Sequence, residues 1–251
     1  MAGRVCLTGV VRIEGATGER VLHGDQPRLL LVRTALDAGH PIPADVLALV
    51  LWPTATRHSE GALRGVVAKV RSFLASDASL ENTGHCYRFL PGPASVDVDD
   101  AAEALSDAEA ATAEHRWADA AAAADAAIAL LHDPLLPGVD AEWLDPWRSR
   151  LERHGGRARR AGALAHSALG HHDAARDLAE AAVEPDPFDE ASHRTLMGVL
   201  LAGGNRSEAV RAYGRLRTLL ADELGVGPDA ETRAMYEQAV RDPPTPRRDA
   251  G

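Results

Sequence analysis

The sequence predicts a predominantly α-helical protein with a smaller α+β part at its N-terminus. Three observations lead to this expectation. Residues 1–95 combine β-forming residues with three short helical patterns, whereas residues 96–241 carry amphipathic helical patterns throughout. A pattern of two helices joined by a tight turn also recurs after 34 residues near the C-terminus. With 251 residues, the chain is long enough for two domains that each have a core.

The N-terminal elements follow one another in a recognisable order. Residues 4–23 are rich in β-formers and predict short strands. Helical patterns follow from about Gln26 to Asp37, from Pro43 to Trp52 and from about Ser59 to Ala75. Residues 80–90 then predict a β-hairpin with a turn that contains glycine. Strands, three helices and a terminal hairpin in this order predict a winged helix.

The third helix carries the residues that suggest chemistry. Arg64, Ala68 and Arg71 share one face, and Lys69 and Ser72 lie beside them. The opposite face is an apolar stripe that comprises Leu63, Val66, Val67, Val70 and Leu74. Small side chains would let this helix approach the floor of a groove, where arginines reach phosphates or guanine edges. Taken alone, a cationic face opposite an apolar stripe is more often simply the solvent-exposed side of a helix. The order of the elements along the chain nevertheless favours DNA binding.

The middle of the chain predicts closely packed helices. Residues 97–115 and 116–131 form two alanine-rich helical patterns, and alanine favours close helix contact over a pocket. Prolines then interrupt the chain before a helix that carries Trp143 and Trp147. The two tryptophans are candidates for a partner-binding hot spot. The commoner explanation is that they fill the gap between helical pairs.

Two similar helical pairs lie near the C-terminus. Gly204 and Ala209 repeat Gly170 and Ala175 at a distance of 34 residues, which is the period of the tetratricopeptide (TPR) helix pair. Such pairs stack and cover each other's apolar stripes, so we expect an all-α, TPR-like domain over residues 96–241. Residues 242–251 contain three prolines and no apolar stripe, which predicts a disordered tail.

Charge and composition limit the function further. Residues 1–95 carry ten basic and eight acidic side chains, so the remaining part holds 17 of the 27 basic and 29 of the 37 acidic residues. A part with a net charge of −12 would be repelled by phosphates, so a nucleic-acid contact belongs to the N-terminal part. No apolar run approaches the length of a membrane span, and the start lacks the apolar core of a signal peptide. We therefore expect a soluble, cytoplasmic protein without membrane contact.

Catalytic and metal-binding patterns are weak. His166, His171 and His172 share no spacing with an acidic or sulfur ligand, and exposed histidines at helix ends are commoner than metal ligands. Cys86 beside His85 lacks an orienting carboxylate. There is also no glycine-rich loop followed by Lys-Ser or Lys-Thr for nucleotide phosphates. We expect no catalytic residue, no metal and no cofactor, and an enzyme with a pocket in the helical domain is a remote hypothesis.

Several motifs resemble one family of bacterial regulators. LWPTATRHSEGALRGVVAKVRSFL followed by LENTGHCYRF is similar to the OmpR-type winged helix. DPLLPGVDAEWLDPWRSRLER and ADELGVGPDAETRAMYE resemble the bacterial transcriptional activator domain. The pair in this order, without a receiver domain, is similar to the Streptomyces antibiotic regulatory protein (SARP) family over roughly residues 4–241.

The resemblance implies a sequence-specific activator of a secondary-metabolite gene cluster. It would bind tandem repeats in double-stranded DNA, as a homodimer, and recruit the RNA polymerase holoenzyme. The implied DNA-binding residues lie in the third helix, at its entrance and in the hairpin, and comprise Arg57, Arg64, Ala68, Lys69, Arg71, Ser72, Thr83 and Arg88. Because the pattern lacks a receiver domain, we expect that phosphorylation of an aspartate does not control the activity.

Departures from the family pattern leave an alternative open. Relatives usually have a more basic recognition helix, and often an arginine at the position of Thr83. Gly61 and Gly65 also weaken the third helix, by roughly 1 kcal/mol each relative to alanine. We therefore expect weak binding to a single half-site and useful affinity only on tandem repeats. The alternative is a TPR-like interaction module whose winged helix no longer binds DNA.

Overall fold

A computed structural model shows the chain as two compact units. It describes residues 3–15, 18–54 and 60–241. The first unit comprises residues 1–101 and 130–148, and the second comprises residues 102–129 and 149–251. Arg57 and the predicted tail at 242–251 lie outside the described residues. The predicted fold class, a winged helix followed by an all-α domain, is confirmed; the boundaries at residues 95 and 241 stay predictions.

A four-stranded sheet forms one side of the first unit. Its strands are β1 (Arg4–Cys6), β2 (Arg12–Gly15), β3 (Gly18–Val21) and β7 (Ser95–Val96), in the order β3-β2-β1-β7. β1 pairs antiparallel with β2 and parallel with β7. Alternate β-branched residues point into the core, because Val5, Ile13 and Val96 are buried.

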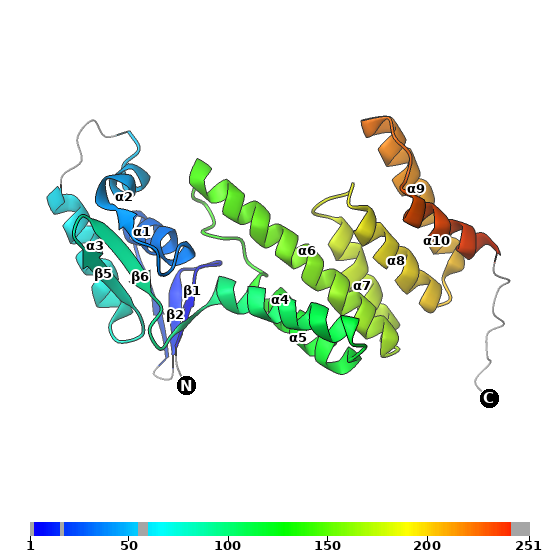
Figure 1. Cartoon of the computed structure of the whole chain (residues 1–251), viewed down its shortest axis with the longest axis horizontal. Coiled ribbons are helices and arrows are strands. Elements are labelled where there is room, and N and C mark those ends of the chain that lie inside the picture. The colour runs from blue at the N-terminus through cyan, green and yellow to red at the C-terminus, as the bar shows by residue number, and fades with distance from the viewer. Residues whose placement is uncertain (1–2, 16–17, 55–59, 242–251) are drawn as a thin grey trace. The chain divides into compact units, whose positions relative to one another are not determined.

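The three helices and the hairpin complete the winged helix (Figure 1). The helices are α1 (Asp25–Leu36), α2 (Ala44–Leu51) and α3 (Glu60–Leu74). β4 (Ile42–Pro43), β5 (Ser79–Thr83) and β6 (Cys86–Leu90) form a second sheet in the order β4-β6-β5. The predicted stripe of α3 is mostly buried, with Leu63, Val67, Val70 and Leu74 in the core. This burial fixes which face of α3 remains outside.

Residues 130–148 also belong to the first unit. Leu135, Leu136 and Leu144 are almost completely buried there. The Arg148 guanidinium donates hydrogen bonds to the carbonyls of Leu135 and Leu136 at 3.2 and 3.0 Å, and to that of Val139 at 2.7 Å. One arginine thus satisfies three carbonyls of a loop that has no regular structure of its own.

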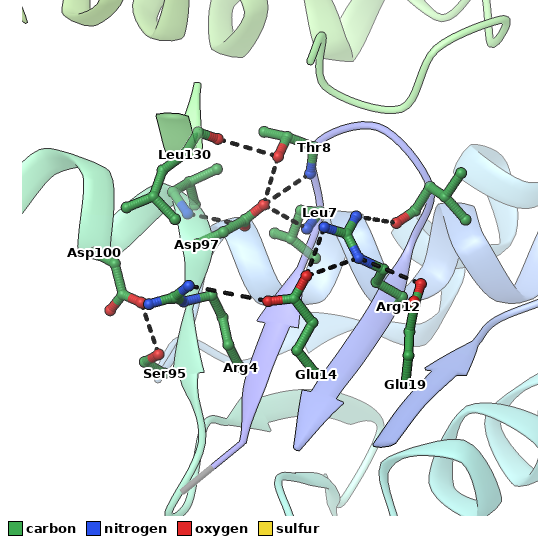
Figure 2. A network of polar contacts seen from close by, with 12 residues as sticks. Arg4, Leu7, Thr8, Arg12, Glu14, Glu19, Ser95, Asp97, Asp100 and Leu130 are labelled. Carbon is green, nitrogen blue, oxygen red and sulfur yellow. Dashed lines mark hydrogen bonds and ion pairs between the residues drawn. The ribbon is translucent and has the colours of Figure 1, made fainter. Parts of the chain in front are cut away.

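A buried carboxylate joins this unit's distant segments (Figure 2). Asp97 is 2% exposed, and its Oδ2 accepts hydrogen bonds from the backbone N–H groups of Leu7 and Thr8 and from the Thr8 hydroxyl, at 2.7–2.9 Å. The same hydroxyl lies 3.2 Å from the carbonyl oxygen of Leu130. Burial raises the pKa of the Asp97 carboxyl, although its hydrogen bonds act in the opposite direction. Asp97 and Thr8 together therefore connect the segment after β1 with the start of α4 (Asp97–Ala113) and the end of α5 (Trp117–Leu130).

The predicted helix with two tryptophans is wrong in one respect. Trp143 lies in a short 3-10 helix, η1 (Glu142–Leu144), whereas Trp147 lies in α6 (Asp145–Ala168). Pro146 occupies the first turn of α6, where its missing N–H costs no hydrogen bond. The α-helix thus begins after Trp143.

The remaining helices are α4 (Asp97–Ala113), α5 (Trp117–Leu130), α7 (His172–Val183), α8 (Glu190–Ala202), α9 (Arg206–Leu224) and α10 (Ala230–Arg241). Between residues 97 and 241, all of which the structure describes, the chain forms no strand beyond a single bridge at Leu135. Small cores in the second unit consist mainly of alanine, including Ala108, Ala124 and Ala161. The alanine-rich helices therefore pack closely against one another, as the sequence predicts.

The 34-residue repeat is present in the backbone. Gly170 and Gly204 both take left-handed conformations, with φ of 81° and 76°. The N–H after each glycine donates to a carbonyl five residues earlier, at 2.9 Å in the first turn and 2.7 Å in the second. Ala175 and Ala209 are fully buried in one core. The TPR-like prediction is confirmed.

Candidate nucleic-acid interface

One face of α3 is exposed and carries the predicted contacts. Arg64, Ala68, Lys69, Arg71 and Ser72 are all exposed, opposite the buried stripe. A side chain at Gly65 would meet no atom within 4 Å, so this face is not crowded. Lys69 forms no ion pair with any residue that the structure describes. The face therefore offers cations among small side chains, as a helix that enters a groove requires.

Arg71 differs from the other cations of this face because it holds the hairpin. Its Nε donates a hydrogen bond of 2.7 Å to the carbonyl oxygen of Leu80 in β5. This contact joins the C-terminal half of α3 to the base of the wing. The helical pattern alone could not show it, because the acceptor lies on a strand.

The cation of the wing is already paired. Arg88 and Glu81 face each other in the register of β5 and β6, and their charged atoms lie 2.8 Å apart. Their side chains are 36% and 43% exposed. The Arg88 Nε is buried and has no hydrogen-bond partner among the described residues. Arg88 therefore reaches a phosphate only in competition with Glu81.

The tip of the wing lies near the N-terminal half of α3. A hollow of about 200 Å³ is lined by residues of both elements, among them Arg64, Asn82 and His85. Thr83 is exposed beside Gly84, whose φ of 72° forms the turn. Sequence reasoning did not select Asn82 or His85. Polar residues next to a hairpin turn are the pattern that could have found them.

Trp143 is packed within the first unit. Its ring is half-buried, and the Arg33 guanidinium lies over it at 5.8 Å from the ring centroid. This cation–π geometry supports the role of a gap filler. Trp147 is also half-buried and has contacts within the chain. That either tryptophan binds a partner stays a prediction.

The structure offers little for other chemistry. Burial raises the pKa of the Cys6 thiol to about 12, so a nucleophilic thiolate does not form there at neutral pH. Within the described residues, no group of three or more His, Cys, Asp or Glu side chains is placed to hold a metal ion. None of the described helices is long and apolar enough to cross a membrane.

Comparisons with known proteins agree with this architecture. Residues 96–240 match the model of the bacterial transcriptional activator domain. The chain is 25% identical over 217 residues to the regulatory protein AfsR of Streptomyces griseus, covering 86% of this chain and 22% of AfsR. It is also 25% identical over 227 residues to the transcriptional regulatory protein EmbR of Mycobacterium tuberculosis, covering 86% of this chain and 58% of EmbR.

A solved structure shares the fold. The structure of Mycobacterium tuberculosis EmbR in complex with a low-affinity phosphopeptide superposes with a TM-score of 0.80 at 22% identity. The match covers 96% of this chain and 65% of that chain. The chain thus spans only part of these relatives.

Proposed function

The chain belongs to the bacterial transcriptional activator domain family, and from this premise we propose that it is a sequence-specific activator that binds double-stranded DNA. It is a transcriptional regulator related to AfsR and EmbR, and not an enzyme. The exposed face of α3 beside the hairpin carries the proposal. No other part of the described chain joins exposed cations, small side chains and a wing in this way.

Roles can be assigned to the residues of this face. In this proposal α3 enters the major groove, where Ala68 and Ser72 let the backbone approach the base edges. Arg64 would contact a guanine edge or a phosphate, and Lys69 a phosphate. Arg71 holds the wing through Leu80. Thr83 and Arg88 would contact the backbone beside the groove, and Arg57 would do so from the entrance of α3.

The acidic part of the chain supports a protein-binding role. Residues 96–251 carry a net charge of −12, which disfavours contact with phosphates and complements basic surfaces of RNA polymerase. We place the protein in the cytoplasm, bound to direct repeats as a homodimer. Control of a secondary-metabolite gene cluster belongs to the same proposal and rests on the family resemblance.

Fluorescence anisotropy with the full chain tests the proposal. DNA from promoters near the gene should bind more tightly than scrambled DNA of equal length. Arg64→Ala should cost about 1–3 kcal/mol of binding free energy, and Lys69→Ala should reduce the salt slope by about one. Arg217→Ala is the matched control, because Arg217 is an exposed arginine in the helical unit. Equal affinity of all four proteins would contradict the proposal.

One observation favours the alternative of an interaction module. Glu81 pairs with Arg88 and Arg71 is engaged with Leu80, so two of the predicted cations are already occupied. Absence of binding by the wild type to single and tandem sites at low salt would support this alternative, because low salt favours every phosphate contact.

A further inference from the structure

Three ionisable side chains meet in the second unit, which does not contain the proposed DNA-binding helix α3. Asp125 comes from α5, His166 from the end of α6, and His171 from the residue before α7. The Asp125 Oδ1 lies 3.3 Å from the Nε2 of His166, and the Nδ1 atoms of His166 and His171 are also 3.3 Å apart. The two histidine rings thus turn the same kind of nitrogen toward one point.

The separation of the two Nδ1 atoms suits a shared metal ion. Imidazole nitrogens bind Zn²⁺ at about 2.0–2.1 Å, so two ligands at a tetrahedral angle lie about 3.3 Å apart. An N–H···N hydrogen bond would prefer a shorter separation, of about 3 Å. The observed spacing of the two Nδ1 atoms therefore needs little rearrangement for them to occupy two corners of a tetrahedral coordination sphere.

Asp125 prepares His166 to be a ligand. The carboxylate accepts a hydrogen bond from Nε2–H of His166, which leaves the lone pair on Nδ1, the atom that faces His171. A carboxylate behind a histidine is the usual outer shell of a metal site, because it fixes the tautomer and raises the basicity of the ligand. His171, which is an exposed residue, can present its own Nδ1 lone pair in the tautomer that carries the proton on Nε2.

A turn with two backbone hydrogen bonds holds both histidines. The His171 N–H donates to the His166 carbonyl at 2.9 Å, and the Ala175 N–H donates to the His171 carbonyl at 3.0 Å. His171 is exposed, and the His166 side chain is 16% exposed, so an ion from solvent can reach them.

The second repeat shows that the turn itself does not require histidine. At the corresponding positions, 34 residues later, Leu200 and Asn205 form the same backbone hydrogen bond at 2.7 Å. The backbone turn therefore does not explain why both positions of the first turn are histidines. The sequence does not indicate a metal site here, because no acidic or sulfur ligand shares the spacing of these histidines. Asp125 lies 41 residues before His166 and meets it only in the folded chain.

We propose that His166 and His171 bind a divalent transition-metal ion that prefers imidazole, such as Zn²⁺, with Asp125 as the outer-shell partner. No third protein ligand completes the set within the described residues, so water fills the remaining positions. Binding would join α5, α6 and α7 through one ion. It would thereby stabilise the helical unit, by a free energy that grows with the logarithm of the metal concentration once this exceeds the dissociation constant.

Isothermal titration of the untagged, metal-free full chain with Zn²⁺ tests the site. The wild type should bind one Zn²⁺ with a measurable binding enthalpy. His171→Ala should bind Zn²⁺ at least tenfold more weakly than the wild type. Asp125→Asn should weaken binding about tenfold, because outer-shell changes typically cost 10–100-fold. His172→Ala is the matched control and should bind within twofold of the wild type.

Circular dichroism of each variant establishes that the helical unit is folded, and its melting temperature gives a second measurement. Added Zn²⁺ should raise the melting temperature of the wild type and of His172→Ala, but not that of His171→Ala. Equal Zn²⁺ affinity of His171→Ala and the wild type would overturn the proposal. An equal loss in His172→Ala, or no binding by the wild type, would overturn it as well.

Discussion

Removing the charge of Glu81 should strengthen DNA binding. Glu81 faces Arg88 across the hairpin at 2.8 Å, on the wing that we place beside the DNA backbone. Glu81→Gln keeps the size of the side chain but removes the negative charge. Arg88 then no longer has to leave an ion pair before it contacts a phosphate.

The magnitude follows from the exposure of the pair. Both side chains are more than a third exposed, and ion pairs of this kind contribute about 0–1 kcal/mol. Release of the pair should therefore lower the dissociation constant by up to about fivefold. If Arg88 gains one phosphate contact, the slope of log K against log salt should steepen by about 0.9.

Anisotropy titrations between about 50 and 200 mM salt measure both quantities. Glu180→Gln is the matched control, because Glu180 forms a similar pair with Arg176 at 2.9 Å in the helical unit. It changes the net charge equally and should leave the salt slope unchanged. If the two variants bind DNA alike, Arg88 does not contact phosphate and the reasoning about the wing is refuted.

Substitutions at four further positions test the fold and the wing. Asp97→Ala leaves three donors without their shared acceptor, so urea unfolding should show a loss of about 3 kcal/mol. Because burial raises the pKa of Asp97, the folded chain holds this proton more tightly than the unfolded chain. The unfolding free energy of the wild type relative to Asp97→Asn should therefore be highest at low pH and fall as the pH rises through the folded-state pKa. Arg71→Ala should weaken binding to all DNA sequences alike through loss of the bond to Leu80, whereas relaxed specificity at one base pair would indicate direct base contact. Gly204→Ala should lower the unfolding free energy by about 1 kcal/mol because of its left-handed backbone, while Gly214→Ala inside α9 should raise it by up to about 1 kcal/mol.

Local patterns explain which parts of the fold could be predicted. The stripe of Leu63, Val67 and Val70 shows the buried face of α3, because helical spacing repeats along neighbouring residues. The repeated glycine turns could be found for the same reason, since Gly170 and Gly204 differ by one period.

Contacts between distant segments could not be predicted. The place of residues 130–148 in the first unit depends on contacts of Pro134, Leu135 and Leu136 with the segment just after β1, more than 120 residues away in the sequence. Asp125 likewise meets His166 only because α5 and α6 pack together. The pairing of Glu81 with Arg88 is a contact between two strands that could still be predicted from a local pattern. A two-residue turn at Gly84-His85 sets the register of the hairpin, and this register places Glu81 opposite Arg88.

A footprint of the full chain on promoter DNA near the gene tests the central claim most directly. Sequence-specific binding by α3 and the wing predicts protection of two direct repeats about one helical turn apart. It also predicts that Arg64→Ala loses this protection at concentrations where Arg217→Ala retains it. Uniform protection along the DNA, or the same footprint with both variants, would contradict the claim.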